Sequence, residues 1–240
     1  MSYHKYIPKD VQELYEIHDF RHAAAILANE FPEEFNDIID SLRKFRIKPQ
    51  HIVDRGGSES QIPKTISNLL RPLNWQEGQL NAKLMVDDEV INFNTHKIDY
   101  VKGRVAFDLE WNSKDQTYDR DLYAFRAFYD YNRISLGILL TRSVGLNPLF
   151  KKFGVMQKFG ASTTQMGKLL PRLNAGRNGG CPILVFGITP NVFEDVDEFL
   201  KNLEITNDFS TKTGSDDLSL KAEEIVMRER EQNTDNAGNL

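Results

Sequence analysis

The chain contains a single cysteine, Cys181, among its 240 residues. One thiol cannot form an internal disulfide, which is typical of proteins of the reducing cytoplasm. The longest apolar runs, ISLGILL and PILVFGI, are far too short to span a bilayer, and the first ten residues lack the apolar core of a secretory signal. The sequence also has no internal repeat and no Cys/His spacing of the zinc type. We therefore expect a cytoplasmic globular protein.

Acidic residues are absent from one long stretch. Residues 131–193 contain no Asp or Glu, and the tail from residue 204 accounts for the whole formal net charge of −5. A basic block of this length is typical of proteins that bind a polyphosphate such as DNA. A solvated surface that offsets acids elsewhere is the alternative. The cations of the block are Arg133, Arg142, Lys151, Lys152, Lys158, Lys168, Arg172 and Arg177.

The hydrophobic periodicity predicts an α/β fold with helices on both faces of a sheet. Helical spacing covers residues 11–30, 32–47 and 119–133, and a last helix is expected over 191–203 with Asn191 as its cap. Strands are expected over 80–86 and 89–94 as a hairpin, and over 134–142 and 181–189 as buried runs. Residues 1–203 are predicted to form one domain, and residues 204–240 a polar, mobile tail with one short helix at 220–231.

The stretch KIDYVKGRVAFDLEW, residues 97–111, predicts a strand, a tight turn at Gly103 and a second strand. Residues i and i+2 of a strand point to the same face, so Asp108 and Glu110 share one face while the apolar residues around them point to the other. The turn folds the first strand back and brings Asp99 to the same place. The pattern therefore predicts that three carboxylates converge.

Carboxylates that converge repel one another unless a cation compensates them. Mg²⁺ prefers hard oxygen ligands and is commonly shared between carboxylates and a phosphate, where it supports phosphodiester hydrolysis. A solvated strand edge is the alternative for a single D-x-E. The upstream Asp99 and the basic block favour the metal site.

These residues resemble a known family. IDYVKGRVAFDLEW is similar to the active-site hairpin of PD-(D/E)xK nucleases, and more narrowly to the BglII/BstYI group of type II restriction endonucleases. The helix segment DLYAFRAFYDY and the stretch GRNGGCPILVFGITP follow in the order of that group. The resemblance covers most of residues 10–200. It implies a central mixed sheet of five to six strands flanked by helices on both faces, with N-terminal helices at about 10–47, the catalytic hairpin at 97–111 and a DNA-contacting segment at about 147–180.

The resemblance also implies roles for the site residues. Asp99 and Asp108 are similar to the two metal-binding acids, with the Leu109 backbone carbonyl as a further ligand of one or two Mg²⁺ ions. Glu110 occupies the place of the usual lysine and is expected to orient or deprotonate the attacking water. The group to which the chain is similar usually has Glu where this chain has Asp108. The side chain of Asp108 is shorter and departs from that pattern.

The function that this resemblance implies is cleavage of double-stranded DNA at a short palindrome, leaving 5′-phosphate and 3′-hydroxyl ends. A homodimer is expected, with contacts through the helix at 119–133, and a cognate DNA methyltransferase is expected as a separate protein. Several members of the group act on sites with a GATC core. The alternatives are a structure-specific or repair nuclease, a non-catalytic DNA-binding relative, and a protein-interaction scaffold.

Three loops contain candidates for DNA contact. Side chains with suitable donors and acceptors for bases are Asn112, Ser113, Lys114, Ser162, Thr163, Thr164, Gln165, Arg177 and Asn178. The lysines expected to contact phosphates are Lys151, Lys152 and Lys158. Each of them can instead be an ordinary loop residue.

Weaker signals have ordinary structural explanations. His18 and His22 are spaced i, i+4 on an expected helix without a third ligand, and His96 precedes Asp99 as an expected surface histidine. Trp75 and Trp111 are expected in the core, as is Cys181.

Overall fold

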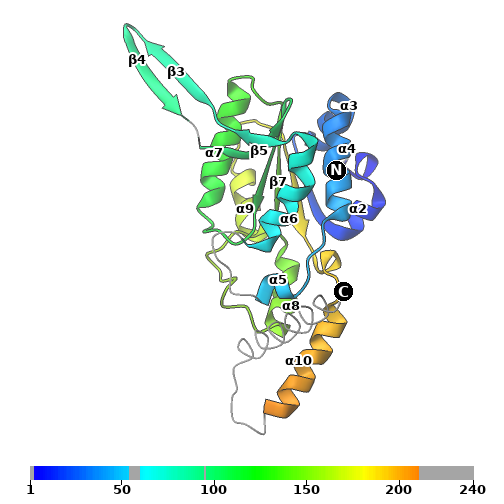
Figure 1. The fold of residues 1–240 in the computed structure, drawn as a ribbon. Coiled ribbons are helices and arrows are strands. Elements are labelled where there is room, and N and C mark those ends of the chain that lie inside the picture. The colour runs from blue at the N-terminus through cyan, green and yellow to red at the C-terminus, as the bar shows by residue number, and fades with distance from the viewer. Residues whose placement is uncertain (1–2, 54–59, 95, 211–240) are drawn as a thin grey trace, which may run out of the picture.

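The computed structural model describes residues 3–53, 60–94 and 96–210 (Figure 1). Its strands are β1 (Tyr15–Phe20), β2 (Gln76–Gly78), β3 (Asn81–Val86), β4 (Glu89–Asn94), β5 (Ile98–Lys102), β6 (Val105–Glu110), β7 (Leu136–Arg142) and β8 (Ile183–Ile188). The helices are α1 (Tyr3–Tyr6), α2 (Lys9–Leu14), α3 (Ala23–Glu30), α4 (Pro32–Lys44), α5 (Gln50–Val53), α6 (Gln61–Leu70), α7 (Thr117–Asp130), α8 (Asn147–Lys152), α9 (Met166–Asn174) and α10 (Val196–Ser210). Three 3-10 turns are η1 (Arg71–Leu73), η2 (Val144–Leu146) and η3 (Pro190–Val192). None of the helices within these residues is long and apolar enough to cross a membrane.

Six strands form a mixed sheet in the order β1-β8-β7-β6-β5-β2. The three central strands β6, β7 and β8 run parallel, and β1 and β5 join them antiparallel. Every residue of the central strands is buried, as expected for parallel strands covered on both faces. The expected mixed sheet of five to six strands between two helical layers is confirmed.

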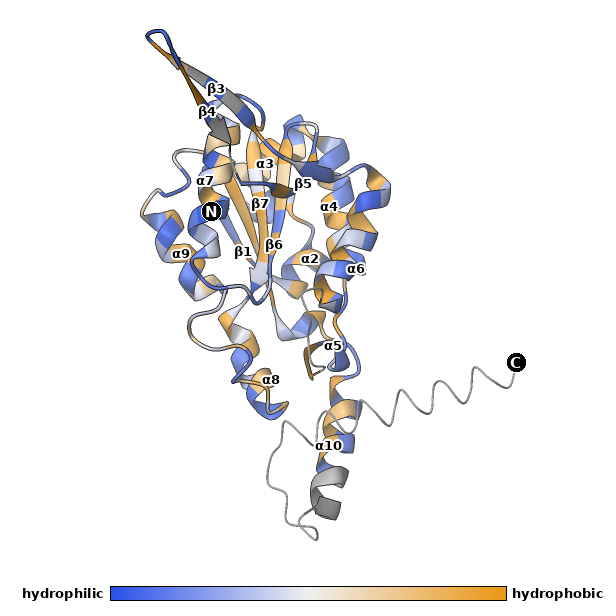
Figure 2. Cartoon of the chain, turned by 60° about the vertical axis from the view of Figure 1, so that its left-hand side comes forward, coloured by the Kyte–Doolittle hydropathy of each residue, from blue (hydrophilic) through white to orange (hydrophobic). Residues whose placement is uncertain are grey.

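The two faces of the sheet are covered by different helices. Helices α7 and α9 lie on one face, and α2, α4 and α6 lie on the other (Figures 1 and 2). Hydrophobic residues are concentrated in the strands between the layers (Figure 2). Along β6 the side chains alternate between two cores, with Phe107 and Leu109 in one and Ala106 in the core under α7. The β6 face that also presents Asp108 and Glu110 is therefore the face that α7 covers.

The helix expected over residues 11–30 is wrong in its middle part, where the chain forms strand β1. Tyr15 and Ile17 are buried, while Glu16 between them and His18 after them are half-buried, which is the period of two of a strand. The strand pairs along the edge of β8, and Arg21 and His22 turn the chain into α3 with positive φ. His18 and His22 therefore do not share a helix face.

The C-terminal helix also differs from its expected bounds. It begins at Val196, after the 3-10 turn that contains Asn191, so Asn191 does not cap it. It continues through Ser210, seven residues past the expected end of the domain at residue 203. The short helix expected at 220–231 and the rest of the tail from residue 211 lie outside the described residues.

The expected hairpin at 80–94 is confirmed as β3 and β4, which form a two-stranded arm that projects from the body of the protein (Figure 1). Its register pairs Val86 with Glu89 across the turn at Asp87 and Asp88. Met85 is 72% exposed, and Val90 and Ile91 are exposed too.

The close packing of α7 on the sheet depends on Gly137 in β7. A Cβ atom at this position would lie 2.9 Å from Cδ2 of Phe125 and 3.0 Å from Cδ1 of Ile183. Both distances are at or below the tightest contacts of real Cβ atoms, and Phe125 is a buried residue of α7. Only glycine therefore lets α7 lie at this distance from the strand.

We expect Gly137→Ala to lower the free energy of unfolding by about 1–3 kcal/mol, because the methyl group overpacks the interface between α7 and β7. Urea unfolding measures the change. Gly160→Ala is the matched control, since its Cβ would meet nothing nearer than 4.0 Å. Equal stability of the two variants would contradict this account of the packing.

Candidate active site

The hairpin of β5 and β6 positions two of the predicted acids. Gly103 adopts a φ of +54° in its two-residue turn, a conformation that favours glycine. The register pairs Tyr100 with Phe107, which places Asp99 opposite Asp108. The Asp99 backbone N–H donates a hydrogen bond of 2.7 Å to Oδ1 of Asp108. The turn therefore brings these two residues together as the sequence predicts.

Asp108 and Glu110 lie on one face of β6 and are buried, with exposed fractions of 4% and 7%. Asp99 lies at the rim of the site, where the residue is exposed as a whole although its carboxyl group is partly desolvated by its neighbours. The charges of Asp99 and Glu110 both reach Asp108 and raise its pKa. Burial is the larger cause and raises that pKa well above its usual value.

A fourth carboxyl group, that of Asp121, reaches this cluster from α7. Tyr118, Leu122 and Phe125 form the buried face of this helix, and Asp121 lies on the same face with 3% exposure. Its neighbour Arg120 is half exposed, with Nε 3.4 Å from Oδ1 of Asp121 and Nη2 3.9 Å from Oε1 of Glu110. Helix α7 therefore contributes one buried acid and one accessible cation.

Glu110 and Asp121 lie against each other and share a hydrogen bond between their carboxyl groups. Burial and the charge of Asp121 raise the pKa of Glu110 to about 8. Burial raises the pKa of Asp121 to about 6, although the charge of Arg120 opposes the rise. Within the described part of the chain, no N–H or O–H group donates to Oε2 of Glu110 or Oδ2 of Asp121. Burying two carboxyl groups is costly when each has an oxygen that accepts no hydrogen bond.

A second arginine, Arg71, lies close enough to the cluster for its charge to affect Asp99. Burial raises the pKa of Asp99, while the charges of Arg71 and Arg120 lower it. Arg71 belongs to η1 and lies over the ring of Tyr100, with 4.5 Å from its Cζ to the ring centroid. The acids are therefore bordered by two exposed arginines from different elements, which suits an anionic substrate.

No three His, Cys, Asp or Glu side chains of the described residues are arranged closely enough to hold a metal ion by themselves. Mg²⁺ is commonly held by one or two carboxylates together with waters and substrate phosphates. Asp99, Asp108 and the Leu109 carbonyl are the donor set that the sequence resemblance implies, and they would hold such a cation. The unsatisfied buried oxygens beside them show that the cluster lacks positive charge, so the residues present fit a divalent cation.

Two of the predicted DNA-contacting loops are joined to each other directly after β6. Lys114 and Thr163 form an antiparallel bridge. The Thr164 N–H donates to the Ser113 carbonyl at 2.9 Å, and the Asp115 N–H donates to the Ser162 carbonyl at 2.9 Å. Residues far apart in sequence therefore form one surface next to Glu110. Its exposed members are Asn112, Lys114 and Ser162, and Ser113 and Gln165 are half-buried.

Both threonines of this surface are hydrogen-bonded by Arg142, which lies at the end of β7. The Arg142 side chain is completely buried. Its guanidinium donates to the Thr164 carbonyl at 2.9 Å, to Oγ1 of Thr163 at 2.6 Å and to the Phe159 carbonyl at 3.3 Å. Thr164 itself is buried. In this conformation Thr163 and Thr164 stabilise the loop through their hydrogen bonds with Arg142.

Several other candidate residues are also engaged inside the protein. Asn178 is buried and donates to the Cys181 carbonyl at 2.6 Å. Lys158 donates to the Val53 carbonyl at the end of α5 at 2.6 Å. Arg177 forms an ion pair with Asp119 of α7, and Arg172 lies 3.1 Å from the same carboxylate. The exposed lysines Lys151 and Lys152 lie at the end of α8.

The remaining sequence expectations concern ordinary residues. His96 is exposed, and burial of its ring and the charge of Arg120 lower its pKa. Trp75 and Trp111 are buried, and burial raises the pKa of Cys181 to about 12, as expected of core residues.

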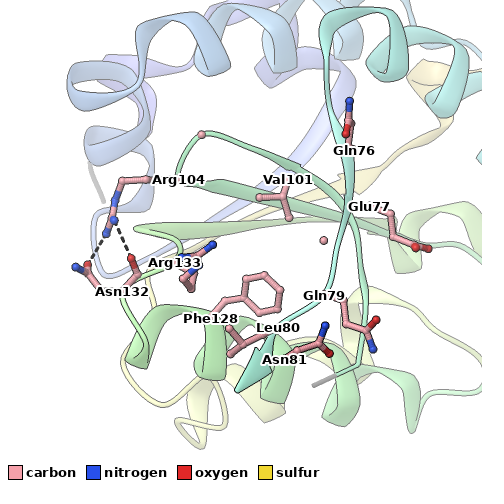
Figure 3. A pocket seen from close by; sticks show the side chains of 12 residues that line it. Gln76, Glu77, Gln79, Leu80, Asn81, Val101, Arg104, Phe128, Asn132 and Arg133 are labelled. Carbon is pink, nitrogen blue, oxygen red and sulfur yellow. Dashed lines mark hydrogen bonds between the residues drawn. The ribbon is translucent and has the colours of Figure 1, made fainter. Parts of the chain in front are cut away.

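A separate cavity of about 750 Å³ lies at the root of the β3–β4 arm, between β2, β5 and the end of α7 (Figure 3). Arg104 closes one side by donating to the Asn132 carbonyl at 2.8 Å, and Phe128 and Leu80 form part of the wall. None of the four clustered carboxyl groups lines it.

The model of the family described as restriction endonuclease BglII/BglIII matches residues 15–188, from β1 through β8. The chain belongs to this restriction endonuclease family. No curated protein matches the chain. A DNA hydrolase is the class of enzyme that the family implies, and the matched range contains the acid cluster and both joined loops.

The sequence reasoning missed Asp121, although a signal was present. On the amphipathic helix of this restriction endonuclease, Asp121 lies three residues after Tyr118 and four before Phe125, in line with the apolar stripe. An acid on an apolar stripe requires a partner in the interior. Identifying that partner as Glu110 requires the tertiary structure.

The raised pKa of Glu110 predicts how the stability of the metal-free endonuclease depends on pH. The folded protein keeps a proton that the unfolded chain releases near pH 4.5, so stability falls as pH rises from about 4.5 to 8. We expect Glu110→Gln to be more stable than wild type at pH 8, by on the order of 1–2 kcal/mol, and similar at pH 5. Thermal unfolding in EDTA at both values measures this, and a constant difference would contradict it.

The burial of Arg142 gives a second prediction. Arg142→Met leaves the Thr164 and Phe159 carbonyls without their donors, which we expect to lower the free energy of unfolding by about 2–4 kcal/mol. Lys152→Met removes an exposed cation of the same basic block and is expected to stay within about 0.5 kcal/mol of wild type. Urea unfolding compares the two. Similar losses would show that the buried hydrogen bonds matter little.

Proposed function

We propose that the protein is a type II restriction endonuclease that hydrolyses double-stranded DNA at a short palindrome in a Mg²⁺-dependent reaction. The observation that supports this most directly is the cluster of Asp99, Asp108 and Glu110 on the β5–β6 hairpin, in a chain of the BglII/BglIII family. The products expected are 5′-phosphate and 3′-hydroxyl ends. A palindrome with a GATC core is the site that we propose, following the resemblance to the BglII/BstYI group.

Asp99, Asp108 and the Leu109 carbonyl would hold the cation, which supplies Lewis-acid activation of the scissile phosphate and of water when bound. The protein's own groups then have separate tasks. Glu110 orients the attacking water and accepts its proton. Arg71 and Arg120, exposed at the rim, are suited to the phosphates on either side because guanidinium groups bind phosphate oxygens in a bidentate manner. Each of these roles is a proposal.

Sequence reading is assigned to the surface formed by residues 112–115 and 160–165. Asn112, Lys114 and Ser162 are its exposed members, and Asn and Lys pair well with adenine and guanine edges in the major groove. Lys151 and Lys152 are suited to phosphate contacts that position the duplex. Residues 112–115 of this surface follow β6 directly in the chain. Bases bound there would therefore lie next to the strand that carries Asp108 and Glu110.

A palindromic substrate favours a homodimer in which each subunit cuts one strand. Helix α7 is the proposed contact, and Tyr123 and Tyr129 are exposed on it. A cognate methyltransferase is proposed as a separate protein that protects host DNA.

The test is incubation of the purified protein with unmethylated plasmid DNA in Mg²⁺ or in EDTA, beside Asp108→Asn and the control Asp40→Asn. We expect discrete fragments that need Mg²⁺, a loss of on the order of 100-fold or more in Asp108→Asn, and wild-type activity in the control. Asp40 lies on α4 in an exposed ion pair with Arg43, away from the helix proposed for the dimer contact.

Other outcomes distinguish the alternatives. A smear without preferred ends would indicate a structure-specific or repair nuclease. Intact DNA despite binding that weakens with salt would indicate a non-catalytic DNA-binding relative, and the absence of binding at low salt would leave a protein-interaction scaffold.

A further inference from the structure

We propose that Asp121 is a positioning residue, which holds the Glu110 carboxyl group in the orientation that Glu110 needs to act on the attacking water. This inference rests on the proposed function and assigns a residue of α7 to it. Asp121 lies outside the β5–β6 hairpin that carries the other three acids.

The position of Asp121 is fixed by its helix. Helix α7 is anchored on the sheet by Leu122, Phe125 and Phe128, all buried in the core on this face. The Tyr118 hydroxyl hydrogen-bonds Oγ1 of Thr141 at 2.6 Å. The Thr141 hydroxyl also hydrogen-bonds the backbone carbonyl of Glu110 at 2.8 Å. One turn of α7 thus contacts Glu110 twice, through this hydroxyl chain at its backbone and through Asp121 at its side chain.

Glu110 has few other restraints. Arg120 Nη2 is 3.9 Å from its Oε1, which is long for an ion pair and involves a half-exposed arginine. A hydrogen bond with Ser113 reaches the carboxyl group from the neighbouring loop. Oε2 receives no donor from the described residues. Asp121 is therefore the buried group that restricts this end of the side chain.

A purely structural explanation of Asp121 is unsatisfactory. A buried structural aspartate usually accepts N–H donors that offset its burial, whereas Oδ2 of Asp121 has none within the described chain. The carboxyl group of Glu110, with which Asp121 shares a hydrogen bond, brings no positive charge to offset the burial. A buried, incompletely satisfied acid pair beside a reactive centre is typical of functional sites, where stability is lost to place a group correctly.

The experiment uses the full chain and a duplex with the mapped cleavage site, under single-turnover conditions at saturating Mg²⁺. Asp121→Ala is expected to cut about 10- to 100-fold more slowly, with unchanged affinity for DNA in EDTA. Asp121→Asn keeps a group that can hydrogen-bond Glu110 and is expected to recover most of the rate. Asp40→Asn on α4 is the control, and thermal unfolding confirms that each variant folds.

A double-mutant cycle with Glu110→Gln provides the decisive readout. If Asp121 acts through Glu110, the double variant Glu110→Gln with Asp121→Ala cuts no more slowly than Glu110→Gln alone. Independent effects that multiply would overturn the inference. So would full activity of Asp121→Ala, or a loss that higher Mg²⁺ restores, which would make Asp121 a cation ligand.

The failure of this inference and that of the proposed function are distinguishable. A wild-type protein that leaves DNA intact would overturn the proposed function and the inference with it. A wild-type protein that cuts at discrete sites, together with an Asp121→Ala variant that cuts equally fast, would overturn the inference alone.

Discussion

Mutual repulsion among buried carboxyl groups is the constraint around which this site is built. Asp108, Glu110 and Asp121 are buried in one cluster, where burial raises the pKa of all three and the charges of Asp121 and Glu110 raise that of Asp108 further. The geometry of this cluster depends on β6 being fixed between β5 and β7, and on α7 lying close to the sheet above Gly137. The stability of the rest of the domain therefore offsets the cost of the site, and the same cost makes the site receptive to a cation.

The features of the site that could be predicted from the sequence are those set by residues close together in the chain. The alternation in RVAFDLEW determines which side chains share a face, and the glycine turn determines that Asp99 returns beside Asp108. Asp121 is different, because helical periodicity places it on the covered face but cannot say which strand residue lies beneath it. Strand β1 shows a further limit. Its alternation of Tyr15 and Ile17 with polar residues lies between two helices, and only the free edge of β8 decides in favour of a strand.

The basic block shows why charge counted along a sequence overstates a binding surface. Its length correctly indicates a protein of a DNA-cleaving family, yet several of its cations have internal tasks. Arg142 is buried, Arg172 and Arg177 are paired with Asp119, and Lys158 binds the end of α5. The acids that pair with the block come from outside it, so composition alone cannot reveal the pairing. The positive charge that remains exposed is therefore more local than the sequence indicates, and includes the lysines of α8 and the arginines at the rim of the acid cluster.

Two hydrogen-bonded paths connect the base-reading surface that we propose with the acids. The first runs from Arg142 at the end of β7 to the carbonyls of the 159–164 loop, which in turn donates to the Ser113 carbonyl just after β6. The second runs from Thr141, the residue before Arg142, to the backbone of Glu110. Adjacent residues of β7 thus hold the loop on one side and the reactive strand on the other. The loop and the backbone of Glu110 are therefore held by the same end of one buried strand.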